Sequence, residues 1–175
     1  MSFEIYILFG GPSSEYEVSF GTRDYFLKLY RDLSPATIHW RRDGVFEILG
    51  KEYSESEAVE YLSEKKVKVI IASHGEKVED GYIQRQFEKN NILFTGSDAS
   101  SCKLSMDKFR SIETTKNIVN SPATYKSTFK NFDYQKMAQK IGEDYPIFVK
   151  PNNLGTSVDI HKVESNSKLE KLTAS

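Results

Sequence analysis

The sequence predicts an α/β protein, with an amino-terminal parallel-sheet domain followed by a smaller α+β region. Two short apolar runs carry this prediction, residues 5–9 and residues 67–72. The second run is rich in β-branched side chains, which is typical of a strand buried on both faces of a parallel sheet. A helical pattern follows each run, and alternation of strands with helices favours a parallel sheet.

Composition limits the classes of function. The 175 residues are 38% hydrophobic, which is enough to bury a core. The formal net charge of -1 gives no basic field for nucleic acid or anionic lipid. No apolar stretch reaches membrane length, and the single cysteine, Cys102, excludes an internal disulfide. We therefore expect a soluble cytoplasmic protein without a nucleic-acid or membrane partner.

The first elements follow from periodicity and turn residues. Residues 3–9 form a strand that ends at two glycines, and residues 37–41 look extended. Between them, residues 15–32 form a helix. Its predicted sheet-facing side chains are Phe26, Leu29, Tyr30 and Leu33. Asp43-Gly44, followed by an apolar run at 45–48, predicts a tight hairpin.

The next elements complete the sheet. Ser54 and Glu57 have the spacing of a capping box, which opens a short helix. Residues 67–72 form a central strand, residues 82–89 a helix, and residues 92–95 a strand closed by a glycine. We place a domain boundary near residue 102.

The second region has a different pattern of apolar and polar residues. We expect a helix over residues 106–119, a strand over 121–126, and a connection rich in lysine and asparagine over 127–146. Two strands, 147–150 and 157–163, then flank a loop at 151–156, and a final helix covers 164–175.

The ends of two strands are the first candidates for a binding site. In open α/β sheets ligands bind beyond the carboxyl ends of the strands, where residues 10–13 and 73–75 lie. Backbone amides there, with Glu15 beside them, form a polar site, and a glutamate suits an ammonium group. The alternative is a plain strand-to-helix turn. His74 can equally satisfy a loop carbonyl, and three scattered histidines do not predict a histidine metal site.

Two lysines are candidates for binding phosphate. Lys150 leaves an apolar strand and enters a loop with Asn, Gly, Thr and Ser, which has the character of a phosphate clamp. Lys108 is ambiguous by itself, because an exposed helical lysine would look the same.

Four sequence blocks occur together and in order. They are FGGPSSEYEVS (9–19), HGEKVEDGYIQ (74–84), TGS (95–97) with SMDK (105–108), and FVKP (148–151) through GTSV (155–158). Together they resemble the D-alanine–D-alanine ligase family of the ATP-grasp superfamily, over nearly the whole chain. The resemblance implies a Rossmann-like substrate-binding domain over residues 1–101 and an incomplete ATP-grasp domain over residues 102–175.

The resemblance also implies an activity. Such ligases join two D-alanines through an acyl phosphate, in the synthesis of peptidoglycan precursors for the cell wall. Glu15 would hold the ammonium group of the first D-alanine, with Val18 and Ser19 shaping its pocket. His74 would lie beside that substrate and its acyl phosphate.

The remaining implied groups concern the nucleotide. Lys108 and Lys150 would bind the phosphates of ATP, and Thr156 and Ser157 would line the phosphate loop. Thr156 joins Glu15 and His74 in the set expected to be catalytic. The implied cofactors are ATP and Mg²⁺ or Mn²⁺, with metal ligands expected beyond Ser175. Ligases of this type are commonly homodimers, so the resemblance makes a homodimer one possible oligomeric state of this chain.

The chain departs from the family pattern at three positions. Val78 and Asp159 stand where glycine is usual, and Thr156 replaces a serine. Because several functional segments of such ligases have no match here, we expect the 175-residue chain alone to be inactive. The alternatives are a non-catalytic ligand-binding remnant of the same fold and another ATP-grasp carboxylate–amine ligase.

Overall fold

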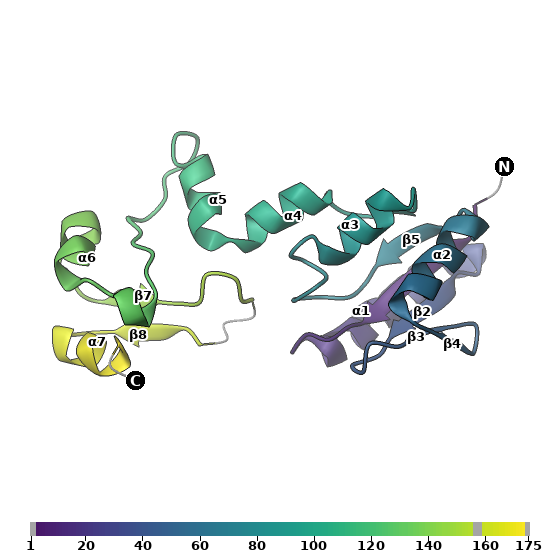
Figure 1. Cartoon of the computed structure of the whole chain (residues 1–175), viewed down its shortest axis with the longest axis horizontal. Coiled ribbons are helices and arrows are strands. Elements are labelled where there is room, and N and C mark those ends of the chain that lie inside the picture. The colour runs from purple at the N-terminus through teal and green to yellow at the C-terminus, as the bar shows by residue number, and fades with distance from the viewer. Residues whose placement is uncertain (1–2, 156–158, 174–175) are drawn as a thin grey trace. The chain divides into compact units, whose positions relative to one another are not determined.

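The computed structural model describes residues 3–155 and 159–173, and the chain divides into two compact units, residues 1–104 and 105–175. A six-stranded sheet in the order β4-β3-β2-β1-β5-β6 forms the first unit (Figure 1). The strands are β1 (Ile5–Gly10), β2 (Ala36–Trp40), β3 (Phe46–Ile48), β4 (Lys51–Tyr53), β5 (Lys68–Ile71) and β6 (Leu93–Phe94). The α-helices are α1 (Tyr16–Leu29), α2 (Glu55–Lys65), α3 (Tyr82–Lys89) and α4 (Ala99–Met106), which crosses the unit boundary. Strands β2, β1, β5 and β6 run parallel to one another, which confirms the predicted α/β class.

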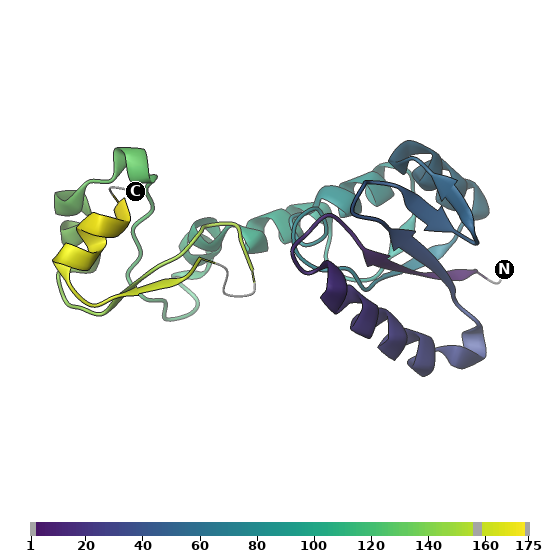
Figure 2. The same ribbon diagram turned by 90° about the horizontal axis from the view of Figure 1, so that it is seen from below.

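Alternate residues of β1 face two different helical layers. Tyr6 and Leu8 are buried in the cluster that contains side chains of α2 and α3. Ile7 and Phe9 are buried in the cluster against which α1 packs. Figure 2 shows α1 and α2 on opposite sides of the sheet. Because both faces of β1 are covered, the strand needs apolar side chains at successive positions rather than alternate ones.

Two predicted local motifs are confirmed. Strands β2 and β3 pair antiparallel across the hairpin, where Gly44 has a φ of +89° and its N–H donates to the carbonyl oxygen of Arg41 at 3.0 Å. At the start of α2, Ser54 Oγ accepts from the Glu57 N–H at 3.4 Å. The Ser54 N–H in turn donates to Glu57 Oε2 at 2.8 Å, which completes the capping box.

The predicted buried face of α1 is partly wrong. Leu29 and Leu33 are 54% and 56% exposed, and a 3₁₀ turn (Arg31–Leu33) follows the helix. The stripe that faces the sheet begins earlier, at Phe20, and Leu29 lies beside it on the solvent side of the helix. The partly buried side chains of this stripe are Phe20, Phe26, Leu27 and Tyr30.

The second unit contains a two-stranded antiparallel sheet of β7 (Ile147–Val149) and β8 (His161–Val163). Its helices are α5 (Lys108–Thr115), a 3₁₀ turn (Phe129–Asn131), α6 (Tyr134–Ile141) and α7 (Asn166–Thr173). Its core is small, with Met137, Val163 and Leu169 as the fully buried apolar side chains among the described residues.

The helix predicted at 106–119 is shorter in the structure, where α5 runs from Lys108 to Thr115, and helix α4, which ends at Met106, was not predicted. The two helices are separate because Asp107 has a non-helical backbone (φ -79°, ψ 95°). Its carboxylate accepts from the Arg110 N–H at 2.9 Å and so caps α5. Asp107 therefore ends one helix and starts the next.

Two further predictions for the second unit are corrected. The described segment 120–128 contains no strand, and β7 pairs only with β8 in this part of the chain. Helix α6 occupies part of the predicted connection, since Asp133 caps it by accepting from the Lys136 N–H at 3.1 Å. Its apolar side chains, Tyr134, Met137 and Ile141, recur at i, i+3 and i+7 and enter the core.

Candidate functional site

The loop after β1 folds closely against β2. Gly10 has a φ of +86°, and a side chain at this position would overlap the carbonyl oxygen of Trp40. The Gly11 N–H donates to that same oxygen at 2.6 Å. Only glycine combines this backbone conformation with so close an approach. The loop thereby places Glu15 directly before the first turn of α1.

Ser13 joins this loop to the loop after β5. Its buried hydroxyl donates to the His74 carbonyl oxygen at 2.6 Å and accepts from the Glu15 N–H at 3.1 Å. Gly75 lies against the same group, because an added Cβ would lie 2.9 Å from Ser13 Cβ and 3.4 Å from Glu15 Oε1. The structure therefore brings Glu15 and the His74 loop together at the carboxyl ends of two adjacent parallel strands.

The His74 ring is held between two side chains. Its Nε2 lies 2.8 Å from Thr22 Oγ1, and its Nδ1 lies 3.7 Å from Glu79 Oε1. The ring remains 28% exposed. Thr22 was missed by the sequence reasoning, although it lies two helical turns after Glu15 and therefore on the same side of α1. Glu79 fixes the ring from the opposite side, so the imidazole is oriented while part of it stays accessible.

Val18 and Ser19 have different environments. Val18 is 57% exposed on α1. Ser19 is fully buried, and its hydroxyl accepts from the Gly10 N–H at 2.8 Å and donates to the Tyr16 carbonyl oxygen at 2.5 Å. Because the Ser19 hydroxyl both donates and accepts a hydrogen bond within the chain, Ser19 supports the loop after β1 from its buried side.

In the second unit, Lys108 and Lys150 lie near each other. Lys150 is exposed directly after β7, and its charge is the second cause, after burial, that lowers the pKa of the Lys108 ammonium group. The Lys108 ammonium donates to the carbonyl oxygens of Asn152, at 3.4 Å, and Leu154. The Lys108 N–H also donates to the Asn152 carbonyl at 3.1 Å. Two neighbouring cations beside a loop form a site for an anion, and the predicted residues Thr156 and Ser157 lie outside the described residues.

The two departures from glycine differ in their surroundings. Val78 is 1% exposed and belongs to the larger core cluster of the first unit. Its carbonyl oxygen accepts from Gln84 Nε2 at 2.5 Å, so this residue fills core volume and supports α3. Asp159 is exposed and has a φ of +53°, in the left-handed region that favours glycine. Aspartate is among the residues that tolerate this region best.

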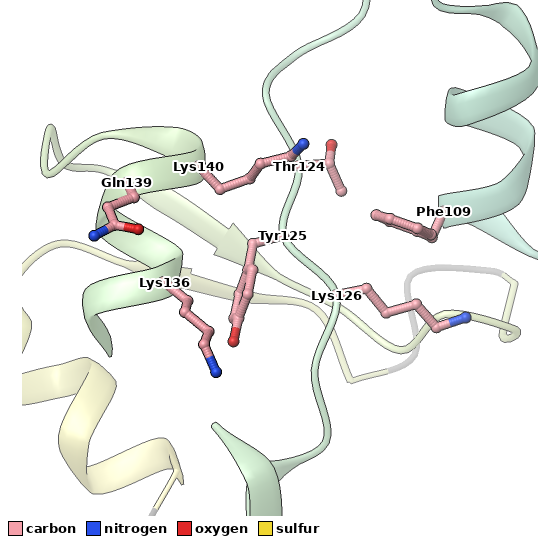
Figure 3. A pocket seen from close by; sticks show the side chains of 7 residues that line it. All are labelled: Phe109, Thr124, Tyr125, Lys126, Lys136, Gln139 and Lys140. Atoms are coloured by element: carbon pink, nitrogen blue, oxygen red, sulfur yellow. The ribbon is translucent and has the colours of Figure 1, made fainter. Parts of the chain in front are cut away.

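A separate cavity of about 320 Å³ lies within the second unit (Figure 3). Its lining includes the aromatic rings of Phe109 and Tyr125 and the side chains of Lys126, Lys136 and Lys140. Lys126 lies 3.4 Å from a carboxylate oxygen of Asp107, and Lys136 lies 3.3 Å from one of Asp133. Because carboxylates neutralise two of these lysines, this cavity is a weaker anion site than the Lys108 and Lys150 pair.

No group of three or more His, Cys, Asp or Glu side chains in residues 3–155 and 159–173 could hold a metal ion. None of the helices in this part of the chain is long and apolar enough to cross a membrane.

Comparison with known proteins links the chain to one group of enzymes. Residues 114–175 match the family described as D-ala D-ala ligase C-terminus. The chain is 32% identical over 169 residues to the D-alanine–D-alanine ligase of Vesicomyosocius okutanii, covering 94% of this chain and 51% of that protein. It is 31% identical over 163 residues to D-alanine–D-alanine ligase B of Clostridium perfringens, covering 90% and 48%. The chain thus spans about half the length of the curated relatives it matches.

Solved structures show the same fold. D-alanyl-alanine synthetase A of Vibrio cholerae superposes with a TM-score of 0.78 at 20% identity, over 99% of this chain and 55% of that one. The VanG D-Ala:D-Ser ligase of Enterococcus faecalis gives a TM-score of 0.76 at 23% identity, over 99% and 59%. These likenesses show that the chain shares the fold of the corresponding part of those proteins.

Proposed function

We propose that this chain, a member of the D-alanine–D-alanine ligase family, forms the part of an ATP-dependent ligase that binds the first D-alanine and one side of the ATP phosphates. The similarity to ligases of this name along almost the whole chain carries the proposal. Because the chain spans about half of their length, the complete reaction belongs to a protein that also contains the other half.

The first D-alanine is assigned to the loops after β1 and β5. The Glu15 carboxylate provides a negative charge for the substrate ammonium group, and Val18 offers exposed apolar surface nearby on α1. Thr22 and Glu79 orient the His74 ring, and we assign this ring to the side of the substrate carboxylate. In this reaction that carboxylate becomes an acyl phosphate, which the amine of a second D-alanine attacks.

The phosphates of ATP are assigned to Lys108 and Lys150. Phosphoryl transfer depends mainly on positioning and on neutralising charge, and this pair provides two adjacent positive charges. Thr156 and Ser157 would add hydroxyl groups in the same loop. Bound Mg²⁺ or Mn²⁺ would supply further neutralising charge, and we assign its ligands to the other half of the enzyme.

The cellular setting follows from the family. We place the protein in the cytoplasm, where it would make D-alanyl-D-alanine for peptidoglycan. A homodimer is also proposed, supported by the exposed Tyr25 and Leu29 on α1. Light scattering of the purified protein would distinguish a dimer from a monomer.

Two other functions have some support. Similarity in fold to the VanG D-Ala:D-Ser ligase favours a ligase with a different second substrate. A non-catalytic remnant is favoured by Val78 and Asp159, where the family usually has glycine. Offering a panel of D-amino acids together with D-alanine would show whether the second substrate is a different amino acid. Absence of ATP turnover in the full-length protein would favour the non-catalytic remnant.

The phosphate assignment can be tested with Lys150. Lys150→Ala in the full-length protein should reduce D-alanine-dependent phosphate release about tenfold or more, because a hydrogen bond to a charged group contributes about 1.5–3 kcal/mol. Lys130→Ala removes another exposed lysine of the same unit and should leave the rate unchanged. Equal rates in the two variants would refute the role of Lys150.

A further inference from the structure

The loop that carries Glu15 is held from the β2 side as well as from the His74 side. Tyr16, the first residue of α1, has its hydroxyl oxygen 2.6 Å from His39 Nε2. His39 lies on β2, which pairs with β1 on the side opposite β5. The segment that contains Glu15 is therefore attached both to β2 and to the loop that follows β5.

The His39 ring has a defined orientation. It stacks on the ring of Phe9 with 4.7 Å between centroids and 6° between planes. Its Nδ1 lies 3.7 Å from Glu47 Oε2, and Glu47 is the residue directly opposite His39 in the antiparallel register of β2 and β3. With the ring stacked and one nitrogen directed to a carboxylate, the other nitrogen points to the Tyr16 hydroxyl.

Arg42 adds a second contact from the same side. Its guanidinium carbon lies 4.4 Å from the centre of the Tyr16 ring, and a terminal nitrogen lies 3.9 Å from Glu17 Oε1. Cations attract aromatic faces at this distance. The residues that follow Glu15 are thus fixed by side chains of β2 and of the turn after it.

We propose that His39 is a positioning residue for Glu15 and acts through Tyr16. The Glu15 side chain makes no capping hydrogen bond to α1, so the backbone of the first helical turn decides where its carboxylate lies. The Tyr16 and His39 pair fixes that turn against the sheet. This inference rests on the proposed role of Glu15 in binding the ammonium group of the first D-alanine, since a displaced carboxylate binds that group less well.

The test compares single side-chain changes in the full-length protein. Tyr16→Phe removes only the hydroxyl group and should raise the KM for the first D-alanine about threefold to tenfold, with the KM for ATP unchanged. His39→Leu should have the same effect, and His39→Gln should restore part of it because the amide can bond to the hydroxyl. The double variant Tyr16→Phe/His39→Leu should be no worse than the more affected single variant, since both remove one interaction.

Two comparisons make the outcome decisive. Tyr53→Phe, at a tyrosine on the edge strand β4 of the same unit, should leave the KM for D-alanine unchanged. If Tyr16→Phe also leaves it unchanged while Glu15→Gln raises it, the positioning role is refuted and the proposed function stands. If Glu15→Gln itself leaves the KM unchanged, both the positioning role and the assignment of the first substrate site fail. A loss of thermal stability without a change in the KM would mean that the pair is structural only.

Discussion

Ser13 and Gly75 are the residues that bring the two loops of the candidate D-alanine site into contact. Ser13 donates to the His74 carbonyl oxygen, and Gly75 leaves room for both Ser13 and Glu15. The backbone of Gly75 is left-handed, with a φ of +78°. Gly75 therefore meets two demands, one on conformation and one on space.

Gly75→Ala separates these two demands when it is compared with Gly96→Ala. Both glycines have a positive φ, but an added Cβ at Gly96 meets nothing within 4 Å, whereas at Gly75 it meets Ser13 at 2.9 Å. Crowding of this kind typically destabilises by about 1–3 kcal/mol. We expect Gly75→Ala to lower the free energy of unfolding by about that much more than Gly96→Ala. Urea denaturation of both variants would measure the difference, and equal losses would show that Gly75 is not crowded.

The neighbours of some candidate residues followed from the sequence, and those of others did not. The proximity of the Glu15 and His74 loops could be predicted because each loop follows an apolar strand and contains glycine, and the structure brings those loops together. Thr22 could not, because its role depends on where the His74 ring lies, which is a contact across 52 residues. The internal hydrogen bonds of Ser19 were hidden for the same reason.

Among the elements, α2 has the most complete local signals. Ser54 caps its first turn, and Ala58, Val59 and Leu62 are buried on one face. Hydrogen bonds from the side chain and then the backbone of Ser54 lower the pKa of Glu57 from its ordinary value of 4.5. The cap therefore couples the stability of this helix to pH.

Ser54→Ala should destabilise the first unit by about 1 kcal/mol at neutral pH, as is typical for loss of an N-cap. A carboxyl group whose folded-state pKa is lowered stabilises the fold above its unfolded pKa, and this contribution disappears as pH falls through the folded value. The difference between wild type and Ser54→Ala should therefore shrink below pH 4.5, where Glu57 becomes protonated. Urea denaturation at pH 7 and pH 3 would measure this, with Ser54→Thr as a control that keeps the cap. A difference that does not change with pH would contradict the coupling.

Elements with strong local patterns could be predicted, and those that depend on distant partners could not. The buried strands β1 and β5 follow from apolar runs, whereas the edge strand β4 has the sequence Lys-Glu-Tyr and forms only by pairing with β3. Helix α4 and the cap at Asp107 were missed because the α4 sequence, Ala-Ser-Ser-Cys-Lys-Leu-Ser-Met, buries only Ala99 and has no apolar stripe at helical spacing. A cap inside a helical pattern is a weak signal until its hydrogen bond is seen.

At the scale of the whole molecule, the two units differ in how much core they contain. The first unit buries side chains on both faces of its sheet, in two clusters. The second has three fully buried apolar side chains among the described residues, and Phe148 on β7 is 63% exposed. A two-stranded sheet with one small core is marginal by itself. This difference agrees with a chain that spans about half the length of its relatives.

The order of blocks along the chain was the strongest whole-molecule signal in the sequence. Each block alone had an ordinary structural explanation, but their sequence and spacing resemble one family, and the relatives carry that name. Because the chain spans about half the length of these relatives, the proposed activity has to be measured on the full-length protein.

The most direct test is to incubate the full-length protein with ATP, Mg²⁺ and D-alanine and to identify the product by mass spectrometry. We predict D-alanyl-D-alanine with one phosphate released per dipeptide. At low D-alanine, Glu15→Gln should reduce the rate about tenfold or more, because it removes a charge-assisted bond to the substrate ammonium group. The control Glu60→Gln, at an exposed position on α2, should not change the rate. Absence of the dipeptide, or equal rates in the Glu15 and Glu60 variants, would contradict the assignment.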